Sequence, residues 1–124
     1  MRVVDSSAWI EWLARGRLVE RLRPMMPGWG SRVVPTIVQL EVAKWLKREV
    51  SERSADAFLG HSQMCIVIPL TTEIAGRAAE LCISHRLATA DAIIYATAMH
   101  MDADLLTCDA HFRNLPGVVY LGKP

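Results

Sequence analysis

The sequence predicts an α/β fold in which a mostly parallel β-sheet carries helices on both faces. Short apolar runs alternate along the chain with longer segments of helical periodicity. The short runs are apolar at consecutive positions, as in strands that are covered on both faces. The chain has 124 residues, enough for one domain with a substantial core, so we expect a single domain over residues 1–124.

The first elements are a predicted strand and helix. Residues 2–4 form a brief β-type run that ends at Asp5, and Ser6 is placed to cap the helix that follows. The apolar positions of this helix are Ala8, Trp9, Trp12 and Leu13. A strand fragment is expected at residues 33–34. Three helices are expected in this half of the chain: residues 18–26, ended by the turn-rich residues 27–30; residues 37–50, capped by Thr36; and a helix from a cap at Ser54 through Ser62.

The second half is predicted to continue the alternation. Residues 65–68 form an apolar strand that Pro69 ends, and residues 71–85 follow as an amphipathic helix. A helix around Asp91 comes next, with Thr89 as its cap. Two further strands are expected at residues 104–107 and 118–121. This order favours parallel pairing with helical crossovers.

Composition excludes several classes of protein. The hydrophobic share is 52%, but no uninterrupted apolar run has transmembrane length. Acidic residues interrupt the N-terminal segment where a signal peptide needs its apolar stretch, so we expect a cytoplasmic protein with no membrane partner. The three cysteines lack a CxxC pair and suggest neither a disulfide framework nor a zinc site. A net charge of +1 does not indicate nucleic-acid binding over the whole surface.

Two acids stand at unusual helical positions. Asp91 shares a helix face with Leu87, Ala88, Ile94 and Tyr95, so its carboxylate follows an apolar stripe. The alternative is an ordinary first-turn acid that the helix dipole favours. Glu41 lies in a similar apolar context, between Ile37, Val38 and Trp45. Its alternative role is a surface ion pair with Lys44.

Two further acids follow predicted strands. Asp5 ends the first strand and Asp109 follows the strand at 104–107, so both fall at the carboxyl edge of a parallel sheet. Either could instead be a turn or cap aspartate. Together Asp5, Glu41, Asp91 and Asp109 can meet in one pocket, where cations must offset their repulsion. All-oxygen ligands suit Mg²⁺ or Mn²⁺ rather than Zn²⁺.

Four segments carry a family resemblance over nearly the whole chain. The stretches VVDSSAWIEWL, VQLEVAKWL, ATADAIIYATA and LLTCDAHF resemble the ordered acidic motifs of PIN-domain nucleases, especially VapC-type toxins of toxin–antitoxin pairs. The resemblance implies a three-layer α/β/α sandwich and a Mg²⁺- or Mn²⁺-dependent endoribonuclease, held inactive by a cognate antitoxin. Asp5, Glu41, Asp91 and Asp109 match its metal-binding acids. Ser6 and Thr107 match hydroxyl residues that support substrate binding.

The resemblance also implies a homodimer, and the early aromatic residues suggest where a partner binds. We expect the antitoxin to cover a groove near Trp9, Trp12 and Trp45. The basic stretches, which could meet RNA, are more simply solvated helix faces: Arg15, Arg17, Arg21 and Arg23, and Lys44, Lys47 and Arg48. The four histidines lack an i, i+4 pair or a neighbouring cysteine ligand, so none is assigned to a metal: His61, His85, His100 and His111.

Two alternative functions remain from the sequence. A receiver-like signalling domain also places aspartates at a sheet edge, but this chain lacks a lysine at a late strand end. A catalytically inactive PIN-like module that binds RNA or protein would keep the fold and lose an acid. All four acids are present, which favours the nuclease.

Overall fold

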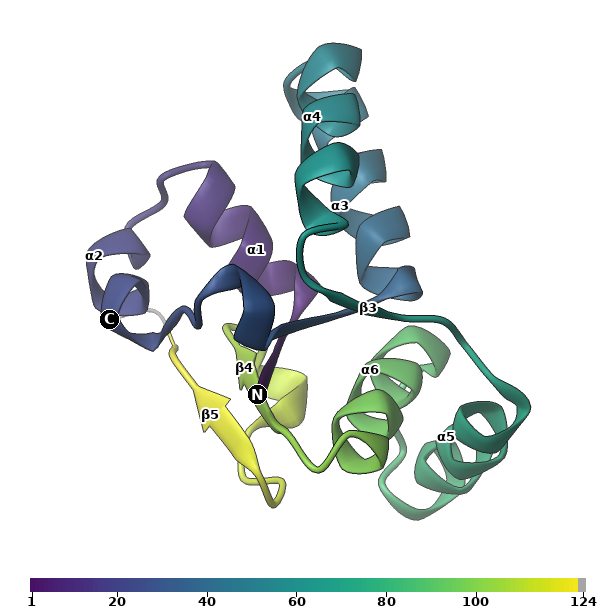
Figure 1. Ribbon diagram of the computed structural model, residues 1–124. Coiled ribbons are helices and arrows are strands. Elements are labelled where there is room, and N and C mark those ends of the chain that lie inside the picture. Colours follow the sequence, from purple (N-terminus) through teal and green to yellow (C-terminus); the bar gives the residue numbers. More distant parts are fainter. Residues whose placement is uncertain (123–124) are drawn as a thin grey trace.

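The computed structural model describes residues 1–122, in which a five-stranded sheet lies between two layers of helices (Figure 1). The strands are β1 (Arg2–Val4), β2 (Arg32–Pro35), β3 (Ile66–Ile68), β4 (Asp104–Thr107) and β5 (Val118–Tyr120). The helices are α1 (Ser6–Leu13), α2 (Val19–Leu22), α3 (Thr36–Glu49), α4 (Glu52–Ser62), α5 (Thr72–Ser84) and α6 (Thr89–His100), with 3-10 turns η1 (Arg23–Met25), η2 (Trp29–Ser31) and η3 (Ala110–Phe112). The predicted α/β/α sandwich is confirmed.

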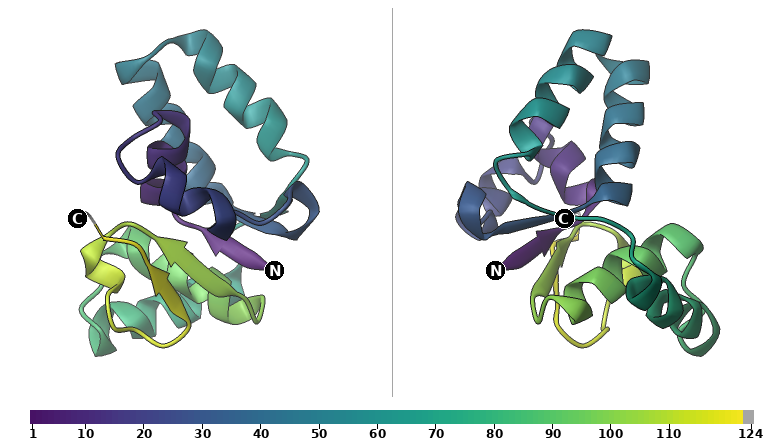
Figure 2. Two further views of the ribbon diagram at one scale, coloured as in Figure 1. Left: turned by 90° about the vertical axis from the view of Figure 1, so that its left-hand side faces the viewer. Right: turned by 45° about the vertical axis from the view of Figure 1, so that its right-hand side comes forward.

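The order of the strands explains the two helical layers. Every pairing in the sheet is parallel, and the order is β3-β2-β1-β4-β5. The chain leaves β1 toward one edge of the sheet and leaves β4 toward the other. Because such crossovers are right-handed, α1 to α4 cover one face, whereas α5 and α6 cover the other (Figure 2). The order also excludes a receiver-like domain, whose strands follow the order 2-1-3-4-5.

The core lies around the three central strands, as the consecutive apolar residues predict. Six side chains of β1, β2 and β4 have no solvent-exposed surface: Val3, Val4, Val33, Val34, Leu105 and Leu106. Strand β3 is different, because it lies at the edge of the sheet and its residues are only half-buried. The expectation that this strand is covered on both faces is therefore wrong.

Several helix starts differ from the predicted caps by one to three residues. Ser6, Thr36 and Thr89 are the first residues of α1, α3 and α6 rather than caps, since the preceding residues take the extended cap conformation. Helix α4 starts before Ser54, because the Ser51 hydroxyl accepts a hydrogen bond from the Ser54 backbone N at 3.0 Å.

The predicted helix over residues 18–26 is shorter than expected. Helix α2 ends at Leu22 and continues as η1, which contains Pro24. Proline has no backbone N–H, so it cannot extend the α-helical hydrogen bonding. At the other end of the chain, β5 ends at Tyr120, one residue before the predicted boundary. None of the helices in residues 1–122 is long and apolar enough to span a bilayer.

Candidate functional site

The candidate site lies at the carboxyl edge of the sheet, between β1 and β4. These adjacent strands lead away in opposite directions, which makes their junction the switch point where open α/β sheets place their sites. Asp5 directly follows β1, and its backbone N donates to the Leu106 carbonyl of β4 at 2.9 Å. Asp109 follows β4 after one residue, as the sequence predicts.

Asp5 is held by two hydroxyl groups. Ser7 Oγ donates to Asp5 Oδ2 at 2.6 Å, and Thr107 Oγ1 donates to the same oxygen at 2.8 Å. Each hydroxyl has one proton, so both oxygens serve as acceptors toward the chain after β4. Ser7 Oγ accepts from the backbone N of Cys108 at 3.0 Å, and Thr107 Oγ1 accepts from that of Asp109 at 2.9 Å. The network fixes the Asp5 carboxylate relative to β4.

Burial and hydrogen bonding act on Asp5 in opposite directions. Asp5 is only 3% exposed, and this burial raises the pKa of its carboxyl above the ordinary value. The hydroxyls of Ser7 and Thr107 oppose this shift, while the nearby charge of Asp109 adds to it. Although Asp5 occupies the cap position of α1, its side chain makes no capping hydrogen bond, so a cap role is excluded.

Glu41 reaches the site from α3. Its Oε1 accepts a hydrogen bond from Ser6 Oγ at 2.6 Å. The alternative ion pair with Lys44 is absent from residues 1–122. Ser6 therefore joins α1 to α3 by holding Glu41. Thr107, for which the sequence predicted a substrate contact, has no exposed surface, and its hydroxyl donates to Asp5.

Asp91 lies in the first turn of α6, as predicted, and its side chain is 18% exposed. Its pKa is raised from 3.8 to about 6, first by burial and then by the charges of Asp109, Asp5 and Glu41. His111 opposes the shift. The carboxylate borders a hollow of about 210 Å³ that His85 to Ala88 and His111 also line. The acid is thus close to three others and open to solvent on one side.

Asp109 has two roles in the structure. Its Oδ1 accepts a hydrogen bond from the His111 backbone N at 2.9 Å and so caps η3, which is the alternative that the sequence left open. The same carboxylate, 30% exposed, contributes to the raised pKa values of Asp5 and Asp91. The cap and the electrostatic role are compatible.

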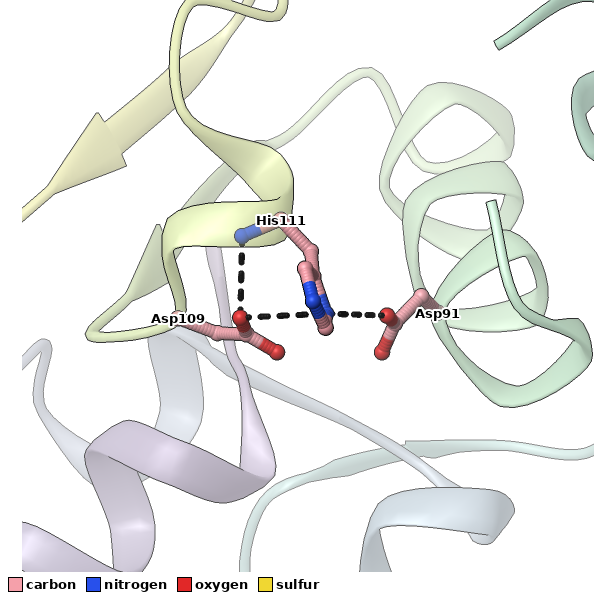
Figure 3. Close-up of side chains that lie close together, drawn as sticks. All are labelled: Asp91, Asp109 and His111. Carbon is pink, nitrogen blue, oxygen red and sulfur yellow. Dashed lines mark hydrogen bonds and ion pairs between the residues drawn. The ribbon is translucent and has the colours of Figure 1, made fainter. Parts of the chain in front are cut away.

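Two residues near the acids were missed in the sequence. Ser7 completes the support of Asp5, although only the neighbouring Ser6 had been singled out. His111 places Nδ1 3.5 Å from Asp91 Oδ2 and 3.4 Å from Asp109 Oδ1 (Figure 3). One ligand atom from each of these three side chains lies within 4.8 Å of the others. The sequence feature that could have identified His111 is its position two residues after Asp109, rather than the i, i+4 histidine spacing of a metal site.

The surroundings of the site agree partly with the sequence. The basic stretches, one from the end of α1 to η1 and one on α3, are exposed, and Arg23 pairs with Glu20 at 3.1 Å. All three cysteines are free thiols. Trp9 is only 2% exposed and packs edge-to-face on Phe58 with ring centroids 5.2 Å apart, so it cannot line a partner groove as expected. Trp12 and Trp45 are partly exposed.

Comparison with solved structures gives neighbours over nearly the whole chain. A chain of a toxin–antitoxin complex from Klebsiella pneumoniae matches with a TM-score of 0.81 and 24% identity, covering 96% of each chain. Mycobacterium tuberculosis VapC20, a sarcin–ricin loop cleaving toxin, matches with a TM-score of 0.75 and 20% identity, over 90% of this chain and 92% of that one. VapBC2 from Rickettsia felis, bound to a promoter DNA fragment, matches with a TM-score of 0.74 and 11% identity, over 99% of this chain and 98% of that one.

These similarities agree with the observed fold. A search of curated proteins gives no match. The PIN domain family model matches residues 2–118. That match takes in β1 to β4, all six numbered α-helices, and each of the four acids at the sheet edge. The chain therefore belongs to the PIN domain family.

Proposed function

We propose that this protein is a metal-dependent endoribonuclease and the toxin of a toxin–antitoxin pair. The observation that carries the proposal is that Asp5, Glu41 and Asp109, from three separate segments, lie near enough to Asp91 for their charges to raise its pKa. Membership of the PIN domain family supports it. Neighbours that are a toxin–antitoxin complex and a sarcin–ricin loop cleaving toxin support it as well.

The donor set fits a hard divalent cation. Carboxylate oxygens are the ligands that Mg²⁺ and Mn²⁺ favour. Burial, and after it the neighbouring carboxylates, raises the pKa of Asp91, and a bound cation would offset the repulsion between these acids. Asp5 and Asp91 would hold the cation directly, with Asp109 and Glu41 holding it directly or through water. When bound, such a cation offsets phosphate charge and makes water a better nucleophile at neutral pH.

The side chains around the acids set their positions. Ser7 and Thr107 fix Asp5 on one oxygen, Oδ2, so the carboxylate cannot rotate without breaking two hydrogen bonds. Ser6 fixes Glu41 in the same way through Oε1. We therefore assign Ser6, Ser7 and Thr107 as positioning residues. An ordered carboxylate cluster of this kind can bind its ligands with little reorganisation.

The experiment uses Asp109→Asn, because asparagine can cap η3 as aspartate does and so keeps the fold. Asp56→Asn, an exposed acid on α4, is the matched control. The purified proteins are incubated with a loop-containing RNA, with Mn²⁺, Mg²⁺ or EDTA, and the ends of the products are sequenced. Internal cleavage that needs a divalent ion and is lost in Asp109→Asn alone supports the proposal. RNA binding without cleavage would indicate the inactive PIN-like module.

Two assembly proposals accompany the activity. A small antitoxin encoded beside this protein is proposed to bind near Trp12 and Trp45, where a hollow of about 440 Å³ lies between α1 and α2 beside Trp12. The chain is also proposed to form a homodimer. Pull-down from the native cell tests the first, since recovery of no small partner would refute it. Light scattering tests the second, since a monomeric mass at micromolar concentration would refute it.

A further inference from the structure

His111 is placed beside the acids by two local constraints. Its backbone N donates to Asp109 Oδ1, which fixes the start of η3. The next residue, Phe112, has no exposed surface and anchors the turn in the core. The imidazole ring consequently lies between two carboxylates that come from different elements, Asp91 on α6 and Asp109 before η3 (Figure 3). Its side chain is 75% exposed, so this position does not arise from packing of the ring.

The distances around the ring are close to those between donors that share a cation. Nδ1 lies 3.5 Å from Asp91 Oδ2 and 3.4 Å from Asp109 Oδ1, both longer than a good charge-assisted hydrogen bond. Two donors that each lie ~2.1 Å from one octahedral cation are roughly 3.0 Å apart at a right angle, so each observed separation would shorten by roughly half an ångström when a cation binds. The three side chains are therefore close to the spacing of a shared coordination shell.

A buried carboxylate completes the environment. Both side-chain hydrogen bonds to Asp5 fall on Oδ2, and in residues 1–122 no side chain donates to its Oδ1. Asp5 is only 3% exposed, and its charge contributes to the raised pKa of Asp91. The cluster thus combines a buried carboxylate, which is hydrogen-bonded by Ser7 and Thr107, with an imidazole nitrogen and two further carboxylates.

We propose that His111 is a nitrogen ligand of the cation and makes the site prefer Mn²⁺ over Mg²⁺. This inference rests on the proposed function, which assigns the metal to the acids alone. Mg²⁺ favours oxygen donors, whereas an imidazole nitrogen suits the first-row transition metals better. One nitrogen ligand at Nδ1 among oxygen ligands consequently strengthens binding of Mn²⁺ more than binding of Mg²⁺.

The experiment measures metal binding rather than activity. Binding of Mn²⁺ and of Mg²⁺ is measured by titration calorimetry for the full chain and for His111→Ala, and the bound Mn²⁺ is observed by electron spin-echo envelope modulation. His100→Ala is the matched control, because His100 also faces a carboxylate, with Nδ1 3.7 Å from Glu73 Oε1. His100 ends α6, whereas Asp91 lies in the first turn of that helix, so the control is remote from the acids. Unchanged melting temperatures without metal check that each variant folds.

The expected result is a ¹⁴N modulation from imidazole in the wild-type protein and in His100→Ala that disappears in His111→Ala. Affinity for Mn²⁺ should fall by about 10-fold or more in His111→Ala, while affinity for Mg²⁺ should change by less than about 3-fold. Equal Mn²⁺ affinity in His111→Ala and no ¹⁴N modulation in the wild type would overturn this inference alone. Absence of any divalent-ion binding to the wild type would overturn the metal site of the proposed function as well.

Discussion

The two halves of the acidic cluster are built differently. On the side of β1 and β4, Asp5 is 3% exposed and accepts two hydroxyl hydrogen bonds, which are part of a network that joins the two strands. On the side of α6 and η3, Asp91 is 18% exposed, has a pKa raised to about 6 and lies near Asp109, which is 30% exposed, and His111, which is 75% exposed. The first half is stabilised by hydrogen bonds, whereas burial and the neighbouring acids make the charged form of Asp91 unfavourable in the second half.

The largest expected effect is on cleavage, from Asp5→Asn on the hydrogen-bonded side. The substitution removes the negative charge of the carboxylate. The oxygen of the new amide must accept the hydrogen bonds from Ser7 and Thr107, so the amide nitrogen takes the place of Oδ1. We expect RNA cleavage to fall on the order of 10³-fold, because a preorganised charge is lost from the reaction centre. Single-turnover cleavage at saturating Mn²⁺ measures the effect, with Asp56→Asn as the control. A loss of less than about 10-fold would remove Asp5 from the reaction centre.

The second effect concerns stability on the same side. Thr107→Val leaves the Asp109 backbone N without its acceptor and removes one donor from the buried Asp5 carboxylate. A loss of about 2 to 3 kcal/mol in the free energy of unfolding is expected, since hydrogen bonds to charged groups are strong and buried unpaired groups are costly. Urea denaturation measures it.

Thr97→Val is the matched control for this substitution. Thr97 is as buried as Thr107, at 1% exposure, but its hydroxyl donates to the Ile93 carbonyl within α6. The hydrogen bond lost in Thr97→Val joins two uncharged groups, and the carbonyl still accepts a backbone hydrogen bond within the helix. The free energy of unfolding should therefore fall by less than about 1 kcal/mol. Equal costs for the two valine variants would mean that the Asp5 network contributes nothing special to stability.

The sequence indicated the four acids of the cluster but not the hydrogen-bond partners that hold them. Asp91 and Glu41 were found because helical periodicity places them among apolar residues, and Asp5 and Asp109 because strand ends in a parallel sheet share one edge. Periodicity reports which face a residue occupies, but not which atom its side chain reaches. The pairing of Ser7 with Asp5 and of Ser6 with Glu41 depends on the exact start of α1, which differed by one residue from the predicted start.

His111 shows a second limit of sequence reasoning. Its approach to Asp91 depends on how η3 folds back over the sheet edge, and no spacing rule joins residues 91 and 111. The edge position of β3 was missed for a related reason, because a three-residue apolar strand reads the same at the edge and in the centre of a sheet.

The third effect is a pH dependence on the side of Asp91. Since the pKa of Asp91 in the folded protein, about 6, lies above its ordinary value of 3.8, protonation favours the folded state. The stabilisation is complete below pH about 4 and is lost as the pH rises through about 6. Without metal, Asp91→Asn should therefore gain stability relative to the wild type over this interval, reaching about 2 kcal/mol at pH 7. Chemical denaturation at pH 4 to 7.5 measures the difference, and a constant difference across this range would contradict the account.

The smallest effect is expected from Ser6→Ala. This change removes the hydrogen bond to Glu41 Oε1 but leaves the carboxylate half-buried, where water can replace the donor. Stability should fall by about 1 kcal/mol or less. Cleavage should fall by about 10-fold through looser positioning of Glu41, with partial recovery in Ser6→Thr, which restores the hydroxyl. Ser84→Ala, on an exposed serine at the end of α5, is the control.

The most direct test of the central claim, that the acids converge to hold a divalent cation, is the melting temperature of wild type and Asp91→Asn with and without Mn²⁺. We predict that Mn²⁺ raises the melting temperature of the wild type, because it binds the folded state, and that this increase shrinks sharply in Asp91→Asn. Without metal, Asp91→Asn should melt at the same temperature as the wild type or higher, since one repulsive charge is gone. An equal Mn²⁺ stabilisation in both proteins, or a large loss of metal-free stability in Asp91→Asn, would contradict the account.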